Sequence, residues 1–164
     1  MHITGYQQVP LLGLWILSAL LNTIMQELLI RGYLYQLIKS QYSTAAAAIA
    51  TTALFTFLHG GALEAGIIPT LNVVTMSLLM GLVLEYTQSL LAPTVMHFLW
   101  NCIGGILLGG VSLAEDYPQL CRTEFTGPVL LSGGAPKMEG SIVVFLLNLL
   151  LIAVFAALLK KRKQ

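Results

Sequence analysis

Residues 10–32, PLLGLWILSALLNTIMQELLIRG, decide how this chain folds. The stretch is apolar enough to cross a bilayer, yet it ends on Gln26, Glu27 and Arg31. A charged group in hydrocarbon costs at least about 2.5 kcal/mol, so it needs a partner or a task. Glu27 and Arg31 are four residues apart, which places them on one helix face and close enough to pair. The stretch therefore predicts a transmembrane helix with polar groups built into it.

The rest of the chain has the composition of a membrane protein. Of its 164 residues, 57% are hydrophobic and 9% are charged, whereas soluble domains carry about 25% charged residues. A span needs about 20 mostly apolar residues. The windows without Asp, Glu, Lys or Arg are 1–26, 40–63, 65–84, 86–114 and 140–159. We therefore expect an integral, multi-pass protein in a lipid bilayer, and the net charge of +1 gives no indication of a nucleic-acid partner.

Breaks between these windows divide the chain into helices. Pro10 suits a first helical turn, Ser43 is a natural N-cap, and Gly60-Gly61 can cap a helix C-terminus. The expected helices are 10–38, 43–59, 69–89, 92–111 and 141–159, with a polar loop at 112–139 and a basic tail at 160–164. We expect an all-α fold in one helical membrane domain over 1–164, with about five transmembrane helices around an intramembrane polar cavity.

Lysine and arginine in the loops predict the orientation of the chain. The basic tail and the turn that contains Lys39 would be cytoplasmic, which puts the N-terminus and the 112–139 loop outside. Counting about 1.5 Å per residue from these turns leaves His97 up to roughly 20 Å from the level of His59. If both histidines belong to one site, either the turn near residue 91 lies within the membrane or the helices tilt and shift.

Gln26 and Glu27 are neighbours that face different directions. Residue 26 lies about 100° further round the helix than residue 27, on a stripe with Ser18 and Asn22. We expect Glu27 to be held by Arg31, while Gln26 faces a cavity. Taken alone, the ion pair could be mutual neutralisation and the glutamine could be a hydrogen bond between helices. A second candidate partner for the arginine is Glu85.

Two histidines and an asparagine add the groups that hydrolysis requires. His59 ends the second expected helix, where the helix dipole alone would favour it. His97 and Asn101 are four residues apart on one face of an apolar helix. An imidazole can act as a base, a metal ligand or a donor, and an amide can only hydrogen-bond. With the carboxylate they could activate water and stabilise an oxyanion.

These residues lie in three motifs that resemble those of the CPBP family, the CAAX protease and bacteriocin-processing membrane peptidases. Gln26-Glu27-Leu28-Leu29-Ile30-Arg31 resembles its Glu-Glu-x-x-x-Arg motif, Phe55-Thr56-Phe57-Leu58-His59 its Phe-x-x-x-His motif, and His97-Phe98-Leu99-Trp100-Asn101 its His-x-x-x-Asn motif. The likeness covers about residues 13–111, and Gly133-Gly134 with Glu139-Gly140 is similar to a segment that follows the core in some members.

The resemblance implies an intramembrane endopeptidase of a bacterial plasma membrane, with a membrane-embedded or membrane-associated peptide as substrate. In this family the first-motif glutamate and the second-motif histidine are thought to activate water. The third-motif histidine and asparagine are thought to hold the oxyanion. By position these roles fall on residue 26, His59, His97 and Asn101, with Glu27 beside them.

Gln26 departs from the family pattern, which has glutamate at this position. An amide cannot take a proton from water, so general-base catalysis through residue 26 should be lost. The chain would then be an inactive form, either an engineered variant or a natural non-catalytic relative. The competing function is an immunity or accessory protein that binds a peptide or a partner helix in the same cavity.

A metal must also be considered, because family members are often labelled metalloproteases. The available zinc ligands would be Glu27, His59 and His97. Their spacing does not resemble a His-Glu-x-x-His zinc helix, and the carboxylate is expected to be occupied by Arg31. We therefore expect a reaction that requires no cofactor, with zinc as the alternative.

Overall fold

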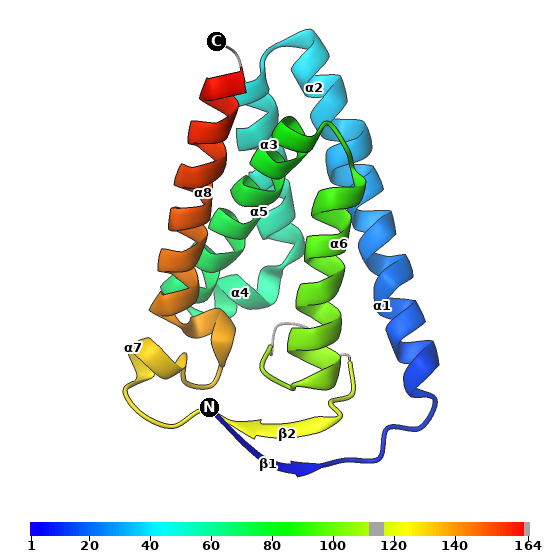
Figure 1. The fold of residues 1–164 in the computed structure, drawn as a ribbon, viewed down its shortest axis with the longest axis vertical. Coiled ribbons are helices and arrows are strands. Elements are labelled where there is room, and N and C mark those ends of the chain that lie inside the picture. Colours follow the sequence, from blue (N-terminus) through cyan, green and yellow to red (C-terminus); the bar gives the residue numbers. More distant parts are fainter. Residues whose placement is uncertain (112–116, 163–164) are drawn as a thin grey trace.

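The computed structural model describes residues 1–111 and 117–162. It is a bundle of helices with a small sheet at one end (Figure 1). The first helix runs without interruption from Leu12 to Gln41, through α1 (Leu12–Glu27), the π-helical η1 (Leu28–Leu34) and α2 (Tyr35–Gln41). It is 30 residues long and apolar, and after Pro10 no proline interrupts it. The first predicted helix is thus confirmed and extends three residues further.

The other predicted helices are also present, but two of them are shorter than a membrane span requires. In the described part of the chain, three helices are long and apolar enough to cross a membrane: Leu12–Gln41, α5 (Ile67–Thr87) and α8 (Ile142–Arg162). The remaining apolar helices, α3 (Thr44–Leu58) and Leu91–Leu107, are shorter. At 1.5 Å per residue, the 15 residues of α3 rise about 22 Å, less than the roughly 30 Å of hydrocarbon. The all-α fold holds, and two of the five expected spans are too short to cross the hydrocarbon fully.

Serine side chains cap the N-termini of two helices. The Ser43 hydroxyl accepts a hydrogen bond from the Ala46 N–H and caps α3, as predicted. Ser141 does the same for α8 through the Val143 N–H. The predicted glycine cap after His59 is wrong. Instead, His59 leaves the helical conformation, at φ −102° and ψ 50°, and Gly60 begins the short helix α4 (Gly60–Ala65).

The turn before α6 (Leu91–Leu99) brings His97 to the level of the first helix. In Figure 1 the turn between α5 and α6 lies closer to the middle of the molecule than the turn between α2 and α3. From there α6 and the π-helical η2 (Trp100–Leu107) run beside α1. The His59 and His97 rings therefore lie close to each other, as a single site requires.

A two-stranded sheet was not foreseen by the sequence analysis. β1 (His2–Tyr6) pairs antiparallel with β2 (Cys121–Glu124), with His2 opposite Glu124 and Tyr6 opposite Cys121. The expected polar loop therefore contains structure: β2, α7 (Val129–Ser132) and the 3₁₀ turn η3 (Met138–Gly140). Pairing between segments more than 100 residues apart leaves no local periodic pattern, which is why a loop was predicted.

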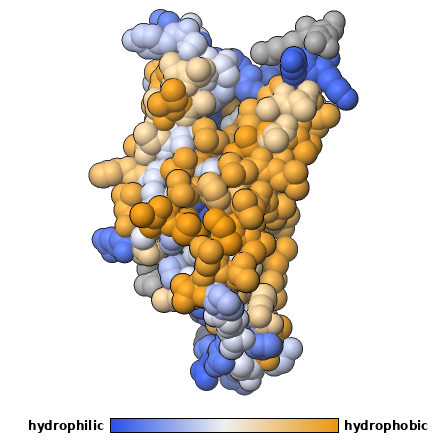
Figure 2. Space-filling model, turned by 90° about the vertical axis from the view of Figure 1, so that its left-hand side faces the viewer, coloured by the Kyte–Doolittle hydropathy of each residue, from blue (hydrophilic) through white to orange (hydrophobic). Residues whose placement is uncertain are grey.

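The molecule has polar groups inside and apolar groups outside. Glu27, Arg31 and His97 are at most 2% exposed, whereas Ile49 and Phe57 are more than two-thirds exposed. Figure 2 shows hydrophobic residues over the middle of one face and hydrophilic residues at both ends. This distribution fits a protein surrounded by hydrocarbon, where apolar side chains meet lipid and ionisable ones turn inward. The end of α2, which contains Lys39, and the C-terminal end of α8 both lie at the end of the molecule opposite the sheet (Figure 1).

Candidate active site

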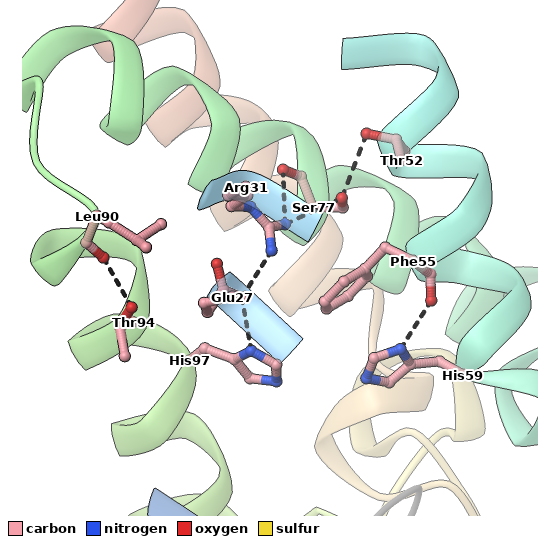
Figure 3. Close-up of polar contacts among 9 residues, drawn as sticks. All are labelled: Glu27, Arg31, Thr52, Phe55, His59, Ser77, Leu90, Thr94 and His97. Carbon is pink, nitrogen blue, oxygen red and sulfur yellow. Dashed lines mark hydrogen bonds and ion pairs between the residues drawn. The ribbon is translucent and has the colours of Figure 1, made fainter. Parts of the chain in front are cut away.

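Glu27 and Arg31 form a buried ion pair where α1 passes into η1. Arg31 Nη1 donates to Glu27 Oε1 at 2.6 Å. Arg31 Nη2 donates to the carbonyl oxygen of Ser77 on α5 at 3.3 Å and to its hydroxyl at 3.1 Å (Figure 3). The Ser77 hydroxyl donates in turn to Thr52 Oγ1 on α3 at 3.2 Å. A buried pair gains from hydrogen bonds to its remaining polar atoms, and here α5 supplies them to the Arg31 guanidinium, whereas Glu27 Oε2 has no hydrogen-bond partner among the described residues.

His97 reaches the same carboxylate from α6. Its Nδ1 lies 2.8 Å from Glu27 Oε1, and because a carboxylate can only accept, Nδ1 carries the proton. Glu27 is therefore shared between Arg31 and His97, whereas its four-residue spacing to Arg31 predicts only the bond to the arginine. Glu85, the second candidate partner of Arg31, instead accepts a hydrogen bond from Lys39 at 2.6 Å.

His59 is fixed by Phe55, one helical turn earlier on α3. The His59 ring stacks on the Phe55 ring with a centroid separation of 4.2 Å and an interplanar angle of 27°. His59 Nδ1 lies 2.8 Å from the Phe55 carbonyl oxygen, to which it must donate. The proton therefore sits on Nδ1, and Nε2 of the neutral ring keeps a lone pair. That is the tautomer that can accept a proton from water.

Phe55 also joins the two histidines and the arginine into one cluster. Its ring lies under the Arg31 guanidinium, with 4.8 Å from Cζ to the ring centroid, and meets the His97 ring edge-on at 5.5 Å. The His59 and His97 centroids are 6.2 Å apart, and both rings face the space between α3 and α6 (Figure 3). Phe55 is the first residue of the Phe-x-x-x-His motif, and no role was predicted for it. Its four-residue spacing to His59 is the sequence feature that indicates the contact between the two rings.

Both π-helical segments lie at the site. Glu27 is the last residue before η1, which contains Arg31, and Asn101 lies within η2, four residues after His97. Single π turns inside α-helices occur frequently at functional sites, because the wider hydrogen-bond pattern changes the direction of the side chains. Sequence periodicity predicted plain α-helix at both places.

A polar cavity of about 510 Å³ adjoins this cluster on the side of the sheet. Gln26, His59 and Asn101 line it. So do Ser18 and Asn22, the two residues predicted to share a stripe with Gln26. Its other lining residues come from α1, from the segment around α4 and from the loop after η2: Trp15, Leu58, Gly60, Gly61, Tyr117 and Glu139.

His97 is the exception among the predicted site residues. It is 2% exposed and lies behind the cavity rather than among the residues that line it. A larger cavity of about 640 Å³ lies between α3, α5 and α8, where Arg31 and mostly apolar residues line it. It contains none of Gln26, His59, His97 and Asn101. The smaller, polar cavity is therefore the one in which the candidate chemistry converges.

Two cavity residues come from the segment that the sequence analysis treated as a loop. Tyr117 accepts a hydrogen bond from Asn22 Nδ2 at 3.2 Å and meets the Trp15 ring edge-on. Glu139, in η3, is 8% exposed. Only the likeness of Glu139-Gly140 to a segment in other proteins pointed to it, and that likeness carried no chemical role.

The candidate zinc ligands Glu27 and His59 already make other contacts in this site. Among residues 1–111 and 117–162, no group of three or more His, Cys, Asp and Glu side chains is arranged to hold a metal ion. Glu27 Oε1 is engaged by both Arg31 and His97, and His59 Nδ1 by a backbone carbonyl.

Comparison with known proteins gives one match. The family model described as type II CAAX prenyl endopeptidase Rce1-like matches residues 8–103. Neither a curated protein nor a solved structure matches the chain. The matched range contains all three motifs and excludes the sheet strand β2, Tyr117 and Glu139.

Proposed function

This chain belongs to the Rce1-like family of type II CAAX prenyl endopeptidases, and we propose that it is an integral membrane protein whose polar cavity hydrolyses a peptide bond of a membrane-associated protein or peptide. The observation that carries the proposal is the convergence of three motifs from three helices. Glu27 binds His97 across 2.8 Å, and the His59 ring faces His97 at 6.2 Å.

Each side chain takes a role that fits its contacts. His59, with Nδ1 committed to the Phe55 carbonyl, presents Nε2 to water in the cavity. Asn101 donates from its amide to the oxyanion that forms on the scissile carbonyl. His97, the second oxyanion donor by motif position, lies behind the cavity and donates to Glu27 through Nδ1, so we assign it a positioning role. The Glu27–Arg31 pair orients His97.

Residue 26 is the departure from this scheme. Gln26 lines the cavity, yet an amide has no useful basicity. Residue 26 therefore cannot act as a general base. Unless another carboxylate in the cavity takes this role, the chain is an inactive form, either engineered or natural. No step of the proposal requires a metal. We place the chain in a bacterial plasma membrane with its basic tail in the cytoplasm.

The test is peptide-bond cleavage by the full chain in phospholipid vesicles. The probe is a peptide that ends in a CAAX sequence with a farnesylated cysteine, and mass spectrometry detects the fragments. Gln26→Glu restores the family carboxylate and should cleave, and His59→Ala in that background should abolish cleavage. Glu124→Gln, which removes an exposed carboxylate on β2, is the matched control and should have no effect. Cleavage that persists with a chelator would support the metal-free scheme.

A second candidate function follows from the amide itself. Gln26, Asn22 and Asn101 give the cavity three amides that can hydrogen-bond an extended peptide without cutting it. An immunity or accessory protein would bind the probe and release no fragments even as Gln26→Glu. That result would replace the peptidase proposal.

A further inference from the structure

Glu139 is a carboxylate in the polar cavity that the three motifs do not account for. It lies outside the matched residues 8–103, yet it lines the same cavity as Gln26, His59 and Asn101. Its side chain is 92% buried, given an exposure of 8%. Glu139 is therefore a nearly buried carboxylate at the wall of the polar cavity, supplied by a segment outside the three motifs.

The segment that carries Glu139 is anchored to the bundle by a buried amide. Asn72 on α5 is 3% exposed, and its Nδ2 donates to the backbone oxygens of Glu139 at 2.8 Å and Ser141 at 3.0 Å. Asn148 on α8 donates to Thr75 Oγ1 at 3.1 Å, one turn along α5 from Asn72. Asn72 on α5 thus holds the backbone of residue 139 against the cavity, and Asn148 on α8 bonds α5 beside it.

Two glycines let the segment close tightly around this position. Gly133 has φ +85°, and a Cβ there would overlap the backbone carbonyl of Lys137. A Cβ on Gly140 would overlap the backbone of Gly133. Only glycine allows such contact between backbones, and its φ at 133 is one that other residues rarely adopt. The backbone on either side of Glu139 is therefore held by glycines as well as by Asn72.

We propose that Glu139 supplies the carboxylate that residue 26 lacks. This inference rests on the proposed function. The Glu139 carboxylate, with His59, takes a proton from a water molecule as the water oxygen bonds to the scissile carbonyl carbon. The carbonyl electron pair moves to oxygen, where Asn101 binds it. The carbon–nitrogen bond then breaks as the same proton passes to the leaving amine, and the other product is a carboxylic acid.

The two cavity residues 26 and 139 complement each other in this scheme. Two carboxylates in one small cavity would repel each other, and one of them would have to stay protonated. An amide at residue 26 avoids that repulsion and can donate a hydrogen bond. In this scheme the catalytic carboxylate comes from residue 139 instead of residue 26, and Gln26 lines the same cavity as an amide. The unmodified chain is then an active enzyme.

The experiment compares four forms of the full chain in vesicles with the farnesylated CAAX peptide. They are the unmodified chain, Glu139→Gln, Gln26→Glu and the double variant Gln26→Glu/Glu139→Gln. We expect the unmodified chain to cleave, Glu139→Gln to lose about 10²–10⁴ in kcat with little change in KM, and the double variant to regain activity, because it returns the carboxylate to residue 26. Glu64→Gln, an exposed carboxylate on α4, is the matched control.

Each outcome decides between the two proposals. Cleavage by Gln26→Glu but not by the unmodified chain would overturn the role of Glu139 and keep the peptidase. Equal rates for the unmodified chain and Glu139→Gln would also overturn that role. No cleavage by any form would remove the proposed function itself. If Glu139→Gln fails to fold in detergent, Glu139→Asp replaces it: a tenfold or larger loss in kcat at constant KM supports the role, and an unchanged kcat overturns it.

Discussion

Two adjacent residues of the first helix belong to two different environments. Glu27 lies in a buried cluster with Arg31, Ser77 and His97, in which every charged group has a partner within 3.3 Å. Gln26 lies in the polar cavity. The buried cluster holds its side chains in place through these contacts, whereas the polar cavity has the free volume and the groups for chemistry. Because consecutive residues of a helix point about 100° apart, Glu27 faces the structural cluster while Gln26 faces the cavity proposed for the reaction.

The largest expected effect tests the cavity. His59→Ala removes the imidazole whose Nε2 faces the cavity, and we expect cleavage by any active form to fall by about 10²–10⁴. The melting temperature in detergent should change little, because His59 is only partly buried. A variant that kept its cleavage rate would show that the cavity does not use this histidine.

The next effect tests the buried cluster. Arg31→Ala leaves the Glu27 carboxylate buried without its main partner, and we expect a loss of roughly 3–5 kcal/mol in unfolding free energy. Lys39→Ala is the matched control, because it breaks the Lys39–Glu85 pair, which is partly exposed, and should cost about 1 kcal/mol or less. Thermal unfolding of both variants in the same detergent makes the comparison. Equal losses would contradict the division between cluster and surface.

Asn101 tests whether a cavity residue affects activity without affecting stability. Asn101→Ala removes a hydrogen-bond donor from the cavity, and loss of one oxyanion donor typically costs about 10²–10³ in kcat. Because the amide is not part of the buried cluster, thermal stability should stay close to that of the unmodified chain. A large drop in stability without a change in kcat would move Asn101 into a structural role.

The smallest effect comes from the edge of the buried cluster. Ser77→Ala removes the hydroxyl that Arg31 and Thr52 share, but the Ser77 carbonyl oxygen still accepts from Arg31. We expect a loss of about 1.5 kcal/mol in unfolding free energy and a cleavage rate within a few-fold of the original. A hundredfold loss of activity would mean that the cluster takes part in the reaction directly.

Residue spacing within one helix predicts contacts along that helix, but it does not predict contacts between segments that are far apart in the sequence. Residues four apart on one helix face, as in Glu27 and Arg31, could be paired from their spacing, and the stripe of Ser18, Asn22 and Gln26 could be placed in a cavity. The Ser43 cap was equally readable. The β1–β2 pairing and the anchoring of Glu139 by Asn72 join segments more than 60 residues apart, and nothing in either segment marks the other.

The two histidines of the site lie in different surroundings. Their motif positions predict that His59 and His97 share one cavity, yet His59 lines it and His97 is buried against Glu27. The deciding contacts are the Phe55 carbonyl for His59 and the position of α6 beside α1 for His97. Both depend on how helices pack, which residue spacing within one helix does not specify.

The π-helical segment η1 has a consequence for the tolerance of the chain to changes in length. A π turn holds one residue more than the α-helical turn it replaces, because its hydrogen bonds span five residues instead of four. Shortening the chain by one residue inside Leu28–Leu34 can therefore be absorbed by reversion to α-helix, and the residues on both sides keep their orientation. The same shortening in α1 would rotate everything before it by about 100° relative to the rest. The first helix thus has one place where it can lose a residue and keep Gln26 and Lys39 facing as they do.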